Sequence, residues 1–186
     1  MISTVEKTED KTDAKGSAGM NAENYRSINE TFSESRIRSN TIKALHDVLP
    51  LIMYIFYPVQ LICLGINEGW GSDVFLRFTL IPLGTFVFVT ILRAIINAPR
   101  PYEVYDYTPV VRKQTKGKSF PSRHTASAFI IAMAFLSVNF SIGFIMMGVA
   151  LGIAIIRIVA GVHFVRDVVA GAAMSLLIGV LGFFVF

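Results

Sequence analysis

The sequence predicts an all-α protein, a polytopic bundle of membrane helices, and three observations support this fold class. Hydrophobic residues make up 53% of the 186-residue chain, charged residues 16%, and the mean hydropathy is +0.58. Soluble domains of this length are rarely so apolar. The apolar residues are gathered in runs of about 20, the length with which a helix crosses a bilayer. These runs lack the alternation of a transmembrane β-barrel, which leaves helices as the spanning structure.

Five such runs predict five spans, at 48–67, 74–97, 122–140, 142–160 and 168–186. Short polar connections follow the first and third runs, so we expect two helical hairpins. Between the hairpins, residues 98–121 contain four prolines and three tyrosines. This composition breaks helices and favours an interface, which predicts the main extramembrane loop.

The chain before the first span is predicted to form two segments. Residues 1–27 are polar and hold few large apolar side chains, so we expect a disordered tail. Residues 28–47 carry apolar residues at nearly helical spacing, with basic residues between them, which predicts an amphipathic interfacial helix. The membrane domain is predicted over 48–186. No cleavable signal peptide is expected, because no apolar stretch follows the N-terminus.

The charge distribution indicates the class of partner. Beyond residue 47 the chain has five acidic and ten basic residues, and six of the ten fall within or beside the central loop. A basic protein often binds nucleic acid. Cations gathered at the ends of membrane helices instead favour the headgroup of a lipid phosphate in the bilayer. We therefore expect a membrane lipid phosphate as substrate and no nucleic acid, while the oligomeric state stays open.

Arginines recur at three places where apolar runs begin or end. Clustered guanidinium groups repel one another without an anion, whereas their bidentate forks match phosphate oxygens. Such a cradle also stabilises the charge that spreads over the oxygens during phosphoryl transfer. The candidate phosphate-binding residues, including the serine before one of these arginines, are Arg93, Arg100, Ser122, Arg123 and Arg157.

Two histidines accompany the arginines and are candidates for catalysis. His163 lies four positions before Asp167, so a helix would place both on one face. A carboxylate in that position fixes the tautomer of an imidazole and leaves its other nitrogen free for attack on phosphorus. A purely structural His–Asp pair is the alternative, which the nearby Arg157 opposes. His124 follows the Ser122-Arg123 pair and completes the candidate catalytic set.

Metal catalysis is disfavoured by the acidic residues available. Outside the N-terminal tail and helix the carboxylates are Glu68, Asp73, Glu103, Asp106 and Asp167. These five carboxylates are too few to supply the ligands of a two-metal site, so we expect no metal and no other cofactor. The third histidine, His46, falls in the predicted amphipathic segment, where a solvated or interfacial side chain is expected.

These motifs resemble those of the type 2 phosphatidic acid phosphatase superfamily, which read Lys-x6-Arg-Pro, Pro-Ser-Gly-His and Ser-Arg-x5-His-x3-Asp. The resemblance covers roughly residues 50–186, and all three motifs agree in order and spacing. Three positions differ. Arg93 stands where the family has lysine, Arg123 where it has glycine, and Ile156 where it has serine.

The resemblance implies a mechanism for the candidate residues. His163 would attack phosphorus to give a phosphohistidine, with Asp167 orienting it, and His124 would protonate the leaving oxygen. The phosphate would be bound by Arg93, Arg100, Ser122 and Arg157, with backbone donors near Arg123. Small bacterial members of the family dephosphorylate undecaprenyl diphosphate, phosphatidylglycerophosphate or phosphatidic acid, and the resemblance favours the first of these.

Two other functions and the membrane orientation stay open. Arg123 and Ile156 are also compatible with a catalytically inactive lipid-phosphate-binding or transport module. Vanadium haloperoxidases share this anion cradle, although the apolar spans and the lack of a soluble domain oppose that function. The positive-inside rule places the site in the cytoplasm. Resemblance to lipid-carrier phosphatases favours the outer face of a bacterial cell membrane, which is our expectation.

Overall fold

The structure, a computed structural model, describes residues 20, 22–111 and 115–185. Within these ranges it is all-helical, which confirms the predicted fold class. The elements are α1 (Ala22–Ser33), α2 (Arg36–Asn67), α3 (Asp73–Ile96), α4 (Pro101–Val104), α5 (Arg123–Val138), α6 (Phe140–Val159), α7 (Val165–Val180) and the π-helical turn η1 (Leu181–Val185).

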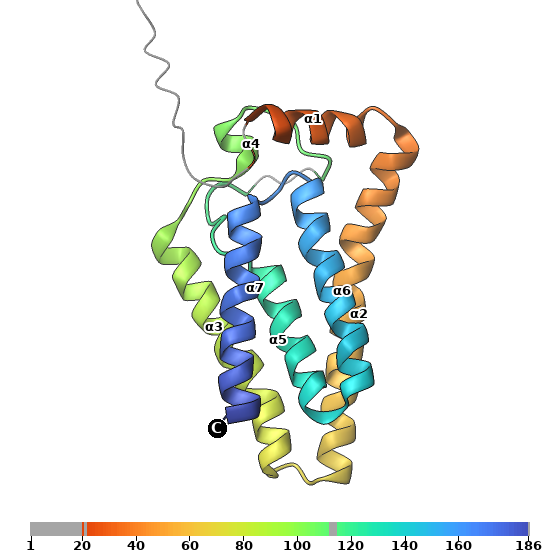
Figure 1. Ribbon diagram of the computed structural model, residues 1–186, viewed down its shortest axis with the longest axis vertical. Coiled ribbons are helices and arrows are strands. Elements are labelled where there is room, and N and C mark those ends of the chain that lie inside the picture. Colours follow the sequence, from red (N-terminus) through yellow and green to blue (C-terminus); the bar gives the residue numbers. More distant parts are fainter. Residues whose placement is uncertain (1–19, 21, 112–114, 186) are drawn as a thin grey trace, which may run out of the picture.

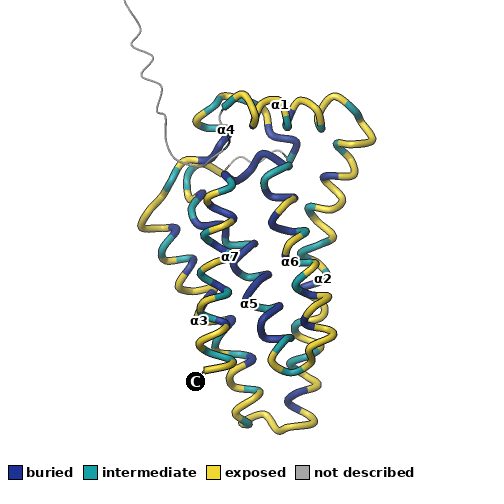
Figure 2. The backbone as a smooth tube through the Cα atoms, viewed as in Figure 1, coloured by how far each residue is buried: buried dark blue, intermediate teal, exposed yellow. Residues whose placement is uncertain are grey.

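The long helices run side by side, with α5 in the middle of the bundle (Figure 1). Helix α5 packs against α3, α6 and α7, and it is among the most buried of the helices (Figure 2). Helix α1 lies across one end of the bundle, the end that also carries α4 and the connection from α6 to α7 (Figure 1). The α2–α3 connection lies at the opposite end. The end of the bundle that carries α1, α4 and the α6–α7 connection is called the elaborated end below.

Four helical segments are long and apolar enough to cross a membrane: Arg36–Asn67, Asp73–Val104, Phe140–Val159 and Val165–Val185. The fifth predicted span, 122–140, is a shorter apolar helix of 16 residues, α5. It ends at Asn139, whose side chain accepts a hydrogen bond of 3.0 Å from the backbone N–H of Ile142 and caps α6. The sharp turn needs glycine at position 143, because a Cβ there would lie 2.4 Å from the backbone nitrogen of Leu136.

The outer faces of the long helices are apolar. Large hydrophobic side chains such as Ile66, Leu80, Ile95 and Phe144 are more than half exposed. Exposed apolar surface on this scale is typical of contact with lipid rather than with water. The protein is therefore an integral membrane protein.

The N-terminal helices differ from the predicted segments. Helix α1 begins at Ala22, inside the stretch predicted as a disordered tail, while residues 1–19 and 21 lie outside the described ranges. The predicted 28–47 helix is interrupted after Ser33, and from Arg36 onward it continues into the first span as α2. Sequence periodicity missed this start because α1 is held by tertiary contacts of polar side chains.

Those contacts tie α1 to the loops at the elaborated end. The Asn29 side chain donates to the carbonyl of Thr108 at 2.6 Å and accepts from the N–H of Val110 at 3.0 Å. The Tyr25 hydroxyl accepts from the N–H of Val165, the first residue of α7, at 2.9 Å. Helix α1 thus joins the loop before α5 to the start of α7.

Candidate active site

A cavity of about 500 Å³ lies at the elaborated end of the bundle and gathers most of the predicted site. Its walls come from the end of α3, the start of α4, residues 115–118, the start of α5 and the α6–α7 connection. Five of the eight predicted residues line it: Arg93, Arg100, Arg123, His124 and His163. Three separate stretches of sequence therefore deliver cations and imidazoles to one space.

The two arginines from the first motif are buried and held by backbone carbonyls. Arg93 donates through Nη1 to the carbonyl of Pro121 at 2.9 Å. Arg100 donates through Nε to Gly117 at 3.1 Å and through Nη1 to Val162 at 3.3 Å, so it joins the central loop to the α6–α7 connection. Carbonyl acceptors orient the guanidinium groups without neutralising them, which leaves their charge available to an anion.

His163 is almost fully buried beside Asp167, but the two do not share a helix face as predicted, because His163 lies before α7 and Asp167 lies in its first turn. Its Nδ1 lies 3.5 Å from Oδ2 of Asp167 and 3.4 Å from Oγ of Ser119. Oδ2 of Asp167 also accepts from Ser119 Oγ at 2.5 Å and from the backbone N–H of Phe164 at 3.1 Å. Since Nδ1 is turned toward this group, Nε2 is the nitrogen left for chemistry in the cavity.

Ser119 is a member of this cluster that sequence reasoning missed. It is fully buried and contacts both Asp167 and His163, yet it lies outside the three motifs. The loop carries it there because the Ser119 N–H donates to the carbonyl of Ala98 at 2.9 Å. Only its place two residues before Pro121 could have drawn attention to it.

The surroundings of His163, which lies in the connection between α6 and α7, favour a neutral imidazole. Burial lowers the pKa of His163 below its ordinary value. Its interaction with Asp167 opposes this shift, while the positive charge of Arg100 reinforces it. A neutral ring carries a free lone pair, which is the form that can act as a nucleophile.

The start of α5 faces the same cavity. Arg123 and His124 are its first two residues, and both line the cavity. The first N–H groups of a helix have no partner within the helix and favour phosphate. Ser122 is the N-cap and is fully buried; its N–H donates to the carbonyl of Asp167 at 2.8 Å. This close approach needs Gly171, where a Cβ would lie 2.7 Å from the carbonyl oxygen of Ser122.

Arg157, a predicted phosphate ligand, contacts a histidine to which the sequence analysis gave no role in the site. Its side chain is 2% exposed and does not line the cavity described above. Its Nη1 lies 2.5 Å from Nε2 of His46 on α2. The side chain of His46 is 11% exposed, so of the two settings expected for it, solvated or interfacial, the solvated one is corrected: α2 brings it against α6.

Two lysines add to the charge of the cavity. Lys116 and Lys118 line it together with three of the arginines. Two further cations of this loop, Arg112 and Lys113, lie outside the described residues. Within the described ranges, no three His, Cys, Asp or Glu side chains come together in a way that could hold a metal ion.

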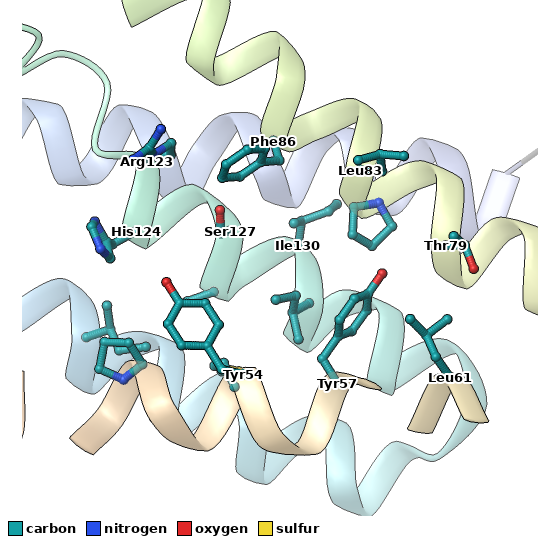
Figure 3. A pocket seen from close by; sticks show the side chains of 16 residues that line it. Tyr54, Tyr57, Leu61, Thr79, Leu83, Phe86, Arg123, His124, Ser127 and Ile130 are labelled. Carbon is teal, nitrogen blue, oxygen red and sulfur yellow. The ribbon is translucent and has the colours of Figure 1, made fainter. Parts of the chain in front are cut away.

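A second cavity, of about 510 Å³, adjoins the first and is mostly apolar. It lies between α2, α3 and α5, and Figure 3 shows Tyr54 and Tyr57 of α2 opposite Leu83 and Phe86 of α3. Arg123 and His124 line both cavities, and the Arg123 guanidinium lies 5.2 Å from the centre of the Phe86 ring. A polar, cationic space therefore meets an apolar one at the start of α5.

Comparison with solved structures agrees with this arrangement. The chain is similar to LpxE of Aquifex aeolicus, with 29% identity, coverage of 87% of this chain and 93% of that one, and a TM-score of 0.66. It also shares its fold with a transmembrane PAP2-type phosphatidylglycerolphosphate phosphatase of Bacillus subtilis, at 20% identity, coverage of 86% and 83%, and a TM-score of 0.59. No curated protein sequence matches the chain.

The family model described as the PAP2 superfamily matches residues 75–186, which hold all three motifs. This range begins in α3 and includes every residue that lines the cationic cavity. The chain therefore belongs to the PAP2 superfamily and is a membrane phosphatase that acts on lipid phosphate.

Proposed function

We propose that the protein hydrolyses its lipid phosphate through a phosphohistidine formed at His163, without a metal ion. One observation carries the proposal: Nδ1 of His163 faces Asp167 and Ser119, while the same ring lines a cavity with His124 and the arginines. A nucleophile, a second imidazole and an anion cradle thus share one space. This arrangement supports nucleophilic phosphoryl transfer.

In the first step Nε2 of His163 attacks phosphorus, and the bond from phosphorus to the leaving oxygen breaks. His124 gives that oxygen a proton, so the lipid leaves as an alcohol or a lipid monophosphate. Asp167 stabilises the positive charge that develops on the ring of His163. Arg93 and Arg100, together with the first N–H groups of α5, hold the oxygens of the transferring phosphoryl group.

In the second step water attacks the phosphohistidine. His124, now neutral, takes a proton from the water as the N–P bond breaks. Inorganic phosphate leaves, and His163 returns to its neutral form. The buried position of His163 supports these two steps, because a neutral imidazole is regenerated more easily where a charged ring is poorly solvated.

The apolar cavity supports a lipid as the leaving group. It reaches the phosphate site at Arg123 and His124, so an apolar chain bonded to the phosphate fits between α2 and α3 (Figure 3). The leaving oxygen of such a substrate falls beside His124, the proposed acid. The same junction would serve poorly for a soluble phosphate ester, which has no chain to fill the apolar space.

Within lipid phosphates we propose a diphosphate, with undecaprenyl diphosphate as the leading candidate. Five cationic side chains line the cavity: Arg93, Arg100, Lys116, Lys118 and Arg123. They exceed what the dianion of a single phosphate neutralises, and a diphosphate offers a second charged group to the lysines. The similar Bacillus subtilis phosphatase is named for phosphatidylglycerolphosphate, so that lipid is the natural competitor.

The test is phosphate release by purified protein in detergent with a chelator present. Undecaprenyl diphosphate, phosphatidylglycerophosphate and phosphatidic acid are compared as substrates. We expect the highest kcat/KM for the diphosphate, and no turnover by His163→Ala. When the substrate carries a radiolabelled phosphate, acid-labile label on the wild-type protein that is absent from His163→Ala reports the phosphohistidine. Turnover by His163→Ala contradicts the nucleophile, loss of activity with chelator contradicts the metal-free mechanism, and no turnover of any lipid favours a binding module.

We also propose that the site opens at the outer face of a bacterial cell membrane, as expected for a phosphatase of lipid carriers. The test replaces Cys63 with serine and introduces one cysteine at either end of the bundle. Val104→Cys lies in α4 at the catalytic end, where the native side chain is 51% exposed. Glu68→Cys lies at the opposite end. An impermeant thiol reagent should label only Val104→Cys in intact cells; the reverse pattern places the site in the cytoplasm.

A further inference from the structure

The unexplained feature of the site is the contact between Arg157 and His46. Arg157 is 2% exposed near the end of α6, and its Nη1 lies 2.5 Å from Nε2 of His46, on α2. The two residues are 111 positions apart in sequence. Sequence motifs predicted Arg157 as a phosphate ligand and gave His46 no role, so the partner of the arginine comes from the fold alone.

The contact fixes the tautomer of His46. A guanidinium is always a donor, so Nε2 of His46 must accept and the ring proton must lie on Nδ1. Nδ1 lies 2.9 Å from Oδ1 of Asp47, a carboxylate that is well exposed, and it donates there. Asp47, His46 and Arg157 therefore form a short chain of hydrogen bonds running from the surface into the bundle.

The contact occupies one edge of the guanidinium. Arginine has five N–H donors in a rigid fork, so a bond from Nη1 to His46 fixes the plane and leaves the other donors to another acceptor. The backbone of Arg157 is also linked by hydrogen bonds to a residue that lines the cationic cavity. Its carbonyl accepts from the N–H of Val162 at 3.3 Å, and the carbonyl of Val162 accepts from Arg100, which lines the cavity.

Arg157 and Arg100 carry like charges and are linked through the backbone of Val162, which bonds to the carbonyl of Arg157 and to the guanidinium of Arg100. Two buried guanidinium groups in this relation are stabilised when an anion lies between them. His46 bonds to Arg157 from α2, and this bond limits how far the Arg157 side chain can move away from Arg100. His46 is suited to this task because it binds the arginine without neutralising it.

We infer that His46 is a positioning residue for phosphate binding: it holds Arg157 so that the free edge of the guanidinium is directed to the phosphate near Arg100. The inference rests on the proposed function, since it deepens the description of the same anion site. It predicts that the acceptor atom at position 46 matters, rather than the charge or the bulk of the side chain.

The experiment compares His46→Leu, which lacks an acceptor, with His46→Gln, whose carbonyl oxygen can replace Nε2. Orthovanadate, a phosphate mimic, is the probe, and its affinity is measured by inhibition and by the rise in Tm that it causes in detergent. We expect His46→Leu to bind vanadate roughly tenfold more weakly, the size expected for one lost hydrogen bond to a charged group. His46→Gln should restore most of this loss. Lys43→Leu places leucine one turn earlier on α2, at an exposed position, and should change nothing.

A double-mutant cycle separates positioning from a structural role. In an Arg157→Lys background, His46→Leu should weaken vanadate binding no further, because both changes act through one interaction. Additive losses, or a His46→Leu protein that binds vanadate as the wild type does, overturn the inference. A lower Tm with an unchanged response to vanadate also overturns it. The failure of this inference and the failure of the proposed function can be told apart. Turnover by His163→Ala contradicts the proposed function, whereas the rise in Tm with vanadate tests the role of His46 without any turnover.

Discussion

Ser119 Oγ donates a hydrogen bond of 2.5 Å to Oδ2 of Asp167. The same carboxylate oxygen lies 3.5 Å from Nδ1 of His163. The other oxygen, Oδ1, is buried without a hydrogen-bond partner among the described residues, and the nearest cation, Arg166, has its Nε 3.7 Å away. The position of the carboxylate against the histidine therefore depends on what holds Oδ2, and among the described residues these hydrogen bonds come from the Ser119 hydroxyl and the backbone N–H of Phe164.

Replacement of Ser119 should slow the chemical step. Ser119→Ala removes this bond and leaves Oδ2 held by the backbone N–H of Phe164 alone, so the carboxylate is less firmly oriented toward His163. Hydrogen bonds to charged groups contribute about 1.5–3 kcal/mol, so we expect a fall in kcat of roughly tenfold to a hundredfold with little change in KM. Ser137→Ala is the control, since that serine bonds to the carbonyl of Ala134 near the far end of α5. Unchanged kcat in Ser119→Ala contradicts this role.

The lowered pKa of His163 predicts a dependence of stability on pH. Burial is the main cause of the shift, so the folded protein resists protonation of this ring more than the unfolded chain, whose histidines titrate near 6.5. As pH falls below about 6.5, the unfolded state takes up the proton first and the free energy of unfolding decreases. The decrease continues until the pH reaches the lower pKa of the folded state.

The measurement is the midpoint of thermal unfolding in detergent between pH 4 and pH 8, for wild type and for His163→Gln. The variant lacks this titrating group, so its midpoint should fall less steeply below about pH 6.5. Identical slopes for the two proteins contradict the assignment of a neutral, buried histidine.

Arg100 should not tolerate replacement by lysine. Its guanidinium bonds to the carbonyls of Gly117 and Val162 at once, and an ammonium group cannot reproduce that fork. Arg100→Lys keeps the charge but loses the geometry, so we expect kcat/KM to drop about tenfold to a hundredfold. Arg77→Lys, far from the site at the start of α3, is the matched control and should match the wild type. Wild-type kinetics in Arg100→Lys show that charge alone suffices there.

The apolar cavity should select the lipid chain. Ser127 lines it between the start of α5 and Tyr54 (Figure 3). Ser127→Trp fills this space, so KM for a long-chain lipid phosphate should rise roughly tenfold or more, while a short-chain phosphate should be affected far less. Leu80→Trp adds the same ring on the outer face of α3, where the native side chain is 57% exposed, and should alter neither. Equal losses for both substrates point to a damaged fold instead.

The sequence predicted the membrane helices and the convergence of five site residues because these follow from short-range patterns. Runs of apolar residues set the spans, and the His163–Asp167 spacing of four keeps the two residues close together, although His163 lies in the connection before α7 and not on the helix. Arg100 was found through its motif with Arg93. Such features need no knowledge of how distant parts of the chain meet.

What could not be predicted depends on contacts between distant segments. Ser119 reaches Asp167 across 48 positions, and His46 reaches Arg157 across 111. Neither residue stands out by spacing or composition, and a solvated or interfacial side chain was expected for His46. The start of α1 was missed for the same reason, because its polar side chains are bonded to loops more than 70 positions away.

The contacts of α1 lead to a last prediction, for Asn29. Its side chain bonds to Thr108 and Val110, in the loop that runs on to the start of α5. Asn29→Leu leaves that carbonyl and that N–H without their partner, so we expect a loss of about 2 kcal/mol in the free energy of unfolding. Since the same loop carries Ser119, kcat should fall as well. Thr31→Leu adds leucine at an exposed position of α1 and should alter neither. If Asn29→Leu lowers stability but not kcat, α1 anchors the loop without positioning the catalytic residues.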